Sequence, residues 1–346
     1  MFKINTFLNY SISLILSNTK RSFESLGKQF AKSGDTIKRW LPKKESSQQA
    51  LMSLAKHLFK NAKVLTLAVD DTLLQKRYSR FMAGASYFFD TKIGRSVMAY
   101  RLIVGALTNG KFIIPIDFGY MFDPESLLPG DEFKTKLDFV KKFYNLAKQL
   151  FPNIKIKLAA DGLFASISIL DWCLKNGIEA VMRMHKNRVV VFKDKTCKIS
   201  DILCLKPKGR QRVRTIKVFW NGMYLYLTAE LRIDKNGIES IVYLIATYKV
   251  KPIQYVYDYK KRWTIEKFFR TSKQHLGLTE CFSRKLIIQE KHVASVLLAY
   301  GLAQLEMQQK KLTTPEQALR AIKQQNIHVA LKRFNRLDQI FGVSTM

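Results

Sequence analysis

The stretch Val64-Leu-Thr-Leu-Ala-Val-Asp-Asp-Thr72 begins the part of the chain in which short apolar runs alternate with amphipathic segments. Six uncharged residues followed by two aspartates are typical of a buried strand that ends near Asp70. Further strand-like runs follow at 98–107 and 111–118. Thr108-Asn-Gly110 between them predicts a hairpin, because Asn-Gly tolerates the positive φ angles of a two-residue turn.

A crossover pattern follows this hairpin. The spacing of apolar residues predicts a helix over 131–150, a strand over 154–160 that ends at Asp161, a helix over 165–175 and a strand over 178–184. A hairpin followed by strand–helix–strand crossovers predicts an α/β fold, in which helices flank both faces of a mixed sheet.

Three further segments accompany this core, which we expect to span residues 61–310. A second Asn-Gly pair, Asn221-Gly222, lies between two strand-like runs and predicts a β-rich insertion at about 187–240. Residues 1–60 are expected to form basic helices, and residues 311–346 a basic helical tail.

The helices expected on either side of Ser33-Gly34 have the spacing of a helix-turn-helix. Asp35 is expected to cap the second helix, on which Lys38 and Arg39 would face DNA. A small helical hairpin without DNA contacts is the alternative.

The charge balance indicates a polyanionic partner. Lysine and arginine number 59 against 27 acidic residues, which gives a formal net charge of +32. Neutralising phosphates with such cations releases counterions, so nucleic acid is the first candidate partner and a membrane surface the second. The 4 cysteines form no CxxC pair and indicate reduced, cytoplasmic thiols rather than zinc or disulfides. We expect no membrane span, because no run reaches about 18 apolar residues.

A polar stripe is predicted on one long helix over 252–276. Tyr259, Arg262, Glu266 and Lys273, at offsets of 0, 3, 7 and 14, project within an arc of about 60°. The carboxylate can hold a metal ion, the arginine and lysine can hold phosphate oxygens, and the phenol can donate to another phosphate. A solvated helix face with ion pairs is the alternative.

Two aspartates complete the candidate site. Asp70 and Asp161 each close a predicted strand, and ligands of open α/β sheets gather at such strand ends. Together with Glu266 they would bind two Mg²⁺ or Mn²⁺ ions and act as the catalytic residues. Asp71 is the alternative to Asp70 as the metal ligand.

Three parts of residues 60–310 resemble bacterial insertion-sequence transposases of the IS-four type. Tyr259-x2-Arg262-x3-Glu266-x6-Lys273 looks like the YREK motif of that family. Leu67-Ala-Val-Asp-Asp-Thr72 resembles its D-x-T element, and Leu158-Ala-Ala-Asp-Gly-Leu-Phe164 resembles the segment around its second aspartate.

This resemblance implies an RNase H-like core with a β-rich insertion before the glutamate helix, and the DDE residues would be Asp70, Asp161 and Glu266. It also implies that Arg183 contacts phosphate. Trp263 or Trp220 could stack on a base flipped out of the duplex, although ordinary packing is the alternative for both.

The implied activity is cut-and-paste DNA transposition: metal-dependent hydrolysis at element ends, followed by strand transfer into target DNA. The implied partners are transposon-end and target duplexes and, in the synaptic complex, a second copy of the chain, all at the bacterial nucleoid. An RNase H-like nuclease without joining activity and a catalytically inactive DNA-binding protein are the alternatives.

Overall fold

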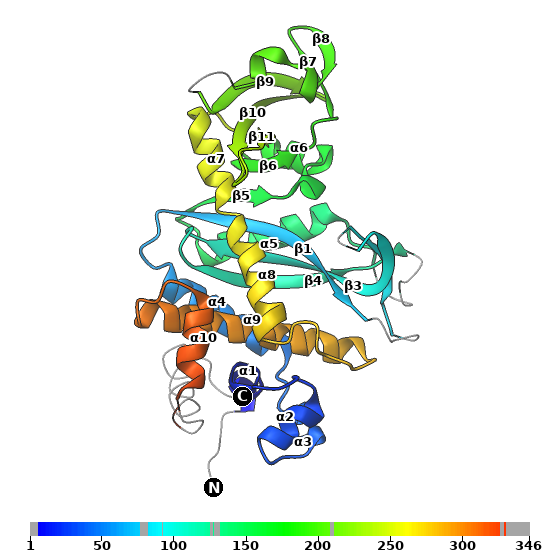
Figure 1. Cartoon of the computed structure of the whole chain (residues 1–346), viewed down its shortest axis with the longest axis vertical. Helices are drawn as coiled ribbons and strands as arrows, with labels where there is room; N and C mark the ends of the chain where they lie inside the picture. The colour runs from blue at the N-terminus through cyan, green and yellow to red at the C-terminus, as the bar shows by residue number, and fades with distance from the viewer. Residues whose placement is uncertain are drawn as a thin grey trace.

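The computed structural model describes residues 6–76, 82–91, 93–124, 127, 132–207, 211–325 and 329 (Figure 1). One mixed sheet runs through the described part of the chain, with strand order β2-β3-β1-β5-β6-β11-β10-β9-β7-β8 and with β4 also paired to β3. The strands are β1 (Val64–Gln75), β2 (Ser86–Asp90), β3 (Arg95–Thr108), β4 (Ile113–Met121), β5 (Lys155–Ala160), β6 (Ala180–Met184), β7 (Val189–Phe192), β8 (Lys195–Lys198), β9 (Val213–Trp220), β10 (Met223–Ile233) and β11 (Glu239–Ala246).

Parallel and antiparallel pairs are both present in this sheet. β1 pairs in parallel with β5, and β5 with β6, while β3, β4 and β11 join antiparallel. The predicted α/β class, with a mixed sheet flanked by helices in an RNase H-like arrangement, is confirmed. The strands of the β-rich segment extend this same sheet, because β11 pairs with both β6 and β10.

Ten α-helices surround the sheet in the described residues. They are α1 (Thr6–Leu16), α2 (Phe23–Gln29), α3 (Gly34–Arg39), α4 (Lys44–Leu58), α5 (Lys136–Leu150), α6 (Ile167–Lys175), α7 (Pro252–Lys260), α8 (Trp263–His275), α9 (Leu286–Gln309) and α10 (Pro315–Lys323). Helix α9 is buried along most of its length, because α1, α4, α8 and α10 pack around it (Figure 1). No helix in the described ranges is both long and apolar enough to cross a bilayer.

Both hairpins predicted from Asn-Gly pairs are present. Gly110, between β3 and β4, has φ +97°, and Asn221 and Gly222, between β9 and β10, have φ +44° and +81°. Asn221 and Gly222 thus form a type I′ turn, with positive φ at both central residues. The loop between β3 and β4 is longer, residues 109–112, and only Gly110 in it has positive φ.

Three predicted boundaries were wrong. β1 does not end at Asp70 but continues to Gln75, because its second half pairs with β3. Ser33 caps α3 in place of Asp35: its side chain accepts a hydrogen bond from the Thr36 amide. The helix predicted from residue 131, which itself lies outside the described residues, begins at Lys136.

The long helix predicted over 252–276 is two helices. α7 ends at Lys260 and α8 begins at Trp263, so Lys261 and Arg262 lie at a break between them. Of the predicted C-terminal tail, α10 is helical, whereas residues 326–328 and 330–346 lie outside the described part of the chain.

Candidate active site

Asp70 and Asp161 lie side by side where two parallel strands separate. The last parallel pair of β1 and β5 is Val69↔Ala160, so each aspartate is the next residue on its strand. β1 then continues with β3 as its partner, while the chain after Asp161 turns into the short 3₁₀ helix Gly162–Phe164. The Asp161 side chain makes no cap hydrogen bond to that helix, so it is not used as a turn residue.

Arg262 joins two of the predicted acids. Its side chain lies at the break between α7 and α8 and is 5% exposed. Nη1 donates to Oδ2 of Asp70 at 2.9 Å, and Nη2 donates to Oε1 of Glu266 at 2.5 Å. The helix break gives Arg262 this place, because α8 then crosses β1 while α7 lies over β5, β6 and β11 (Figure 1).

Burial and neighbouring charges perturb the ionisation of this group. Burial raises the pKa of Asp70 to about 7; Arg262 opposes the rise, and Asp71 and Asp161 add to it. Burial by itself would lower the pKa of Arg262, but Tyr259 and the carboxylates of Asp70, Glu266 and Asp161 raise it. Asp161 therefore lies within electrostatic range of both Asp70 and Arg262.

Asp71 lies on the other face of β1, since successive strand residues point to opposite sides. Its Oδ2 is 3.5 Å from Nε of Arg101. Burial raises the pKa of Asp71, while Arg101 and Lys136 lower it. The backbone amide of Asp71 also donates to Oδ1 of Asp70 at 2.9 Å. On the α8 side of the sheet, Asp70 is therefore the acid that β1 presents.

The other members of the predicted stripe have different surroundings. Lys273 Nζ donates to Thr72 Oγ1 at 2.7 Å and to the Leu73 carbonyl at 3.1 Å, so it fastens α8 to β1. Tyr259 is 2% exposed and packs in a small core, with the Arg262 guanidinium 5.2 Å from its ring centroid. Because of the helix break, the predicted single stripe is divided: its α7 part is buried, and its α8 part is partly exposed.

The predicted DNA contacts divide into exposed and buried residues. Arg183 on β6 is exposed, and Trp263 at the start of α8 is 46% exposed. Trp220 is only 6% exposed, and the Arg188 guanidinium lies 5.9 Å from its ring centroid, so this ring packs against its neighbours. Lys38 and Arg39 are exposed on α3, at the end of the molecule opposite β7 and β8 (Figure 1).

The acids suit a hard divalent cation by chemistry but do not surround one point. Carboxylate oxygens are the ligands that Mg²⁺ and Mn²⁺ prefer. In the described ranges, however, no three acidic, histidine or cysteine side chains are close enough together to hold an ion. Asp70 and Asp161 repel each other at the strand ends, whereas Glu266 is held by Arg262. Two of the three acids, Asp70 and Glu266, instead meet at the guanidinium of Arg262.

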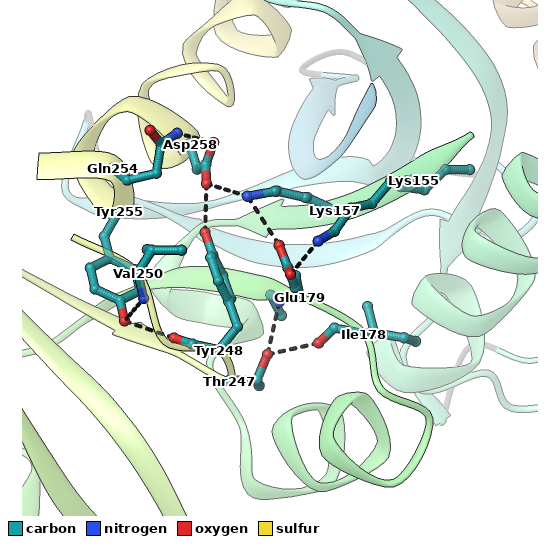
Figure 2. A network of polar contacts seen from close by, with 12 residues as sticks. Lys155, Lys157, Ile178, Glu179, Thr247, Tyr248, Val250, Gln254, Tyr255 and Asp258 are labelled. Carbon is teal, nitrogen blue, oxygen red and sulfur yellow. Dashed lines mark hydrogen bonds and ion pairs between the residues drawn. The ribbon is translucent and has the colours of Figure 1, made fainter. Parts of the chain in front are cut away.

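A second polar group, absent from the sequence interpretation, lies beside this site. Lys157 on β5 donates to Asp258 on α7 at 2.7 Å, and the two residues are 8% and 1% exposed (Figure 2). The signal was available: a lysine inside a strand predicted to be buried needs an acidic partner from elsewhere in the fold.

Comparison with known proteins supports the assignment of the fold. Residues 137–302 match the family model described as the transposase DDE domain. The matched segment includes Asp161, Arg262 and Glu266, while Asp70 precedes it. A comparison with curated proteins gives no match. The family match and the mixed sheet that carries it together identify residues 137–302 as a transposase DDE domain.

Proposed function

We propose that this transposase cuts DNA at the ends of a mobile element and joins those ends to target DNA, as insertion-sequence transposases of the IS-four type do. One observation carries the proposal: Arg262, 5% exposed, binds Asp70 and Glu266, which lie 192 and 4 residues away in the chain. Such a cluster of desolvated charges concentrates at functional sites rather than in cores held together by apolar packing.

Asp70 and Asp161 would hold Mg²⁺ or Mn²⁺, and Glu266 would join them once it leaves Arg262, to give two ions per site. When bound, such ions activate water and offset the charge that develops on phosphate oxygens. Arg262, freed from both carboxylates, can bind two phosphate oxygens through its planar fork, and Lys273 can bind a third.

The chemistry balances without a covalent link to the protein. A water oxygen attacks phosphorus at the element end, the bond to the 3′ oxygen breaks, and that oxygen leaves as a hydroxyl. The 3′-hydroxyl then attacks a phosphodiester of the target, which releases a second 3′-hydroxyl. Double-stranded DNA and a second copy of the chain are the proposed partners, at the bacterial nucleoid.

Cleavage of a supercoiled plasmid that carries the element and its flanks tests the proposal. With Mg²⁺ or Mn²⁺ we expect nicking and joining by the wild type, none with EDTA, and a loss of at least about a hundredfold for Glu266→Gln. Glu290→Gln is the matched control, because Glu290 pairs with Lys44 on the other side of the fold and should cut at the wild-type rate.

Each of the other outcomes would indicate a different function. Cleavage without joined products would indicate a nuclease, and DNA binding without any cleavage would indicate an inactive DNA-binding protein. If Glu266→Gln cuts DNA at the wild-type rate, the assignment of the active site is wrong.

A further inference from the structure

An ion-pair network connects the strand that leads to Asp161 with the helix that leads to Arg262. Lys157 Nζ lies 2.7 Å from Oδ2 of Asp258 and 3.0 Å from Oε2 of Glu179. Oδ2 of Asp258 also accepts from Tyr248 Oη at 2.7 Å, and Oδ1 accepts from Gln254 Nε2 at 3.0 Å (Figure 2). Lys157 therefore bridges β5, the residue before β6, and α7.

The network remains charged at neutral pH. Burial would raise the pKa of Asp258, but hydrogen bonds from Lys157 and Tyr248 hold it below its ordinary value. Burial would likewise lower the pKa of Lys157, yet Asp258 and Glu179 raise it. The Lys157 ammonium also lies 4.7 Å from the Tyr248 ring centroid, which adds a further contact to the charged form.

Both ends of this ion pair lie close in the chain to the candidate active site. Lys157 and Asp161 are four residues apart in extended backbone, so their side chains lie on the same face of the sheet. Asp258 is four residues before Arg262, across the end of α7. The distance between Lys157 and Asp258 therefore fixes how far along β5 the end of α7 lies.

Stability alone does not account for a buried pair at this place. Burying two charges costs about as much as their attraction returns, and apolar residues of similar size often hold such an interface equally well. The small core beside it, with Tyr255, Val256 and Tyr259 packed on Ala159 and Val181, already supplies apolar contact. A charged pair adds what apolar packing lacks, namely one preferred register of the helix on the strand.

We propose that Lys157 and Asp258 are positioning residues, which set the spacing between Asp161 on β5 and the Arg262–Glu266 group on α8. The role in catalysis rests on the proposed function, whereas the spacing itself is a property of the folded chain. Neither residue touches the reacting atoms; each acts through the element that carries it.

The test separates position from stability with two variants. Lys157→Met leaves Asp258 charged and buried, so we expect a marked drop in Tm. Lys157→Met combined with Asp258→Asn removes both charges and keeps an acceptor for Tyr248, so we expect Tm to return close to the wild-type value. The exposed ion pair of Lys175 with Asp171 on α6, at 2.8 Å, is the control, through the matched change Lys175→Met with Asp171→Asn.

Position is measured by double electron–electron resonance between spin labels at Asn145→Cys on α5 and Tyr257→Cys on α7. Both positions are exposed, and α5 packs against β5. The accessible native thiols are removed by Cys197→Ser and Cys204→Ser. We expect one narrow distance for the wild type and for the control pair, and a broader or shifted distribution for the double variant.

Measurements of DNA cleavage then test whether this spacing affects catalysis. We expect the double variant to lose about tenfold to a hundredfold in kcat, with KM for DNA little changed, because misplacement of catalytic groups by about 1 Å has such an effect. A double variant with wild-type Tm, the narrow distance and wild-type kcat would overturn the proposal. A wild type that does not cut DNA would instead refute the proposed function, and the spin-label distances would still decide the positioning role.

Discussion

Replacing Arg262 by methionine should destabilise the fold in a strongly pH-dependent way. The guanidinium is 5% exposed, and it is the cation that opposes the rise in the pKa of Asp70. Methionine fills a similar volume without a charge, so Arg262→Met leaves the Asp70 carboxyl buried beside Asp71 and Asp161 with no counter-charge. Asp70 can respond only by keeping its proton to a higher pH.

The magnitude follows from the two hydrogen bonds. A bond to a charged group contributes about 1.5–3 kcal/mol, and we expect about 2 kcal/mol from the bond to Asp70. The Glu266 side chain is 39% exposed, so solvent screening limits the second bond to about 1 kcal/mol or less. The free energy of unfolding should therefore fall by about 3 kcal/mol at pH 7.

The sign of the pH dependence is fixed by Asp70. Its folded pKa of about 7 lies above the unfolded value, so in the wild type ionisation of Asp70 lowers stability as pH rises toward 7, with no further loss above it. In Arg262→Met the folded pKa is higher still, so the loss continues above pH 7 at up to about 1.4 kcal/mol per pH unit. The gap between the two proteins should thus widen from pH 6 to pH 8.

Urea unfolding followed by circular dichroism at pH 6, 7 and 8 measures this gap. Arg183→Met is the control, since Arg183 is exposed on β6 and should leave stability within about 0.5 kcal/mol. A gap that stays constant with pH would show that Asp70 does not depend on Arg262 for its charge, and the electrostatic account of the site would be wrong.

Three further expectations concern other parts of the chain. Burial lowers the pKa of His292 to about 4, so the folded protein loses up to about 3 kcal/mol of stability as the pH falls from 6.5 toward 4. In thermal unfolding, His292→Asn should lose less stability over this pH range. An unchanged pH profile would show that His292 is not the group responsible. Gly105→Ala would place its Cβ 2.5 Å from the Phe143 ring on α5, so we expect overpacking to lower the free energy of unfolding in urea by about 1–3 kcal/mol. Wild-type stability would mean that α5 can shift away from β3. If α3 contacts DNA, Lys38→Ala with Arg39→Ala should weaken binding similarly for all sequences and reduce the slope of log K against log salt by about 2, whereas an unchanged slope would place the contact elsewhere.

The sequence determined much of the fold by local rules. Two Asn-Gly pairs fixed both hairpins, because they accept the backbone angles of a tight turn at little cost. Apolar periodicity indicated the crossover order of strands and helices that gives the mixed sheet. The stripe motif also selected Arg262 and Glu266 correctly as neighbours, since a spacing of four residues places them on one helical face across the start of α8.

Only the tertiary structure decided how these pieces meet. The break at Lys261 and Arg262 is invisible to periodicity, because both residues are compatible with a continuous helix, and it is packing of α7 and α8 on different parts of the sheet that separates them. β1 passes Asp70 because β3 offers it a partner far along the chain. The pairing of Lys157 with Asp258 joins residues 101 apart, and such a contact depends on the register of strand and helix, which no local pattern records.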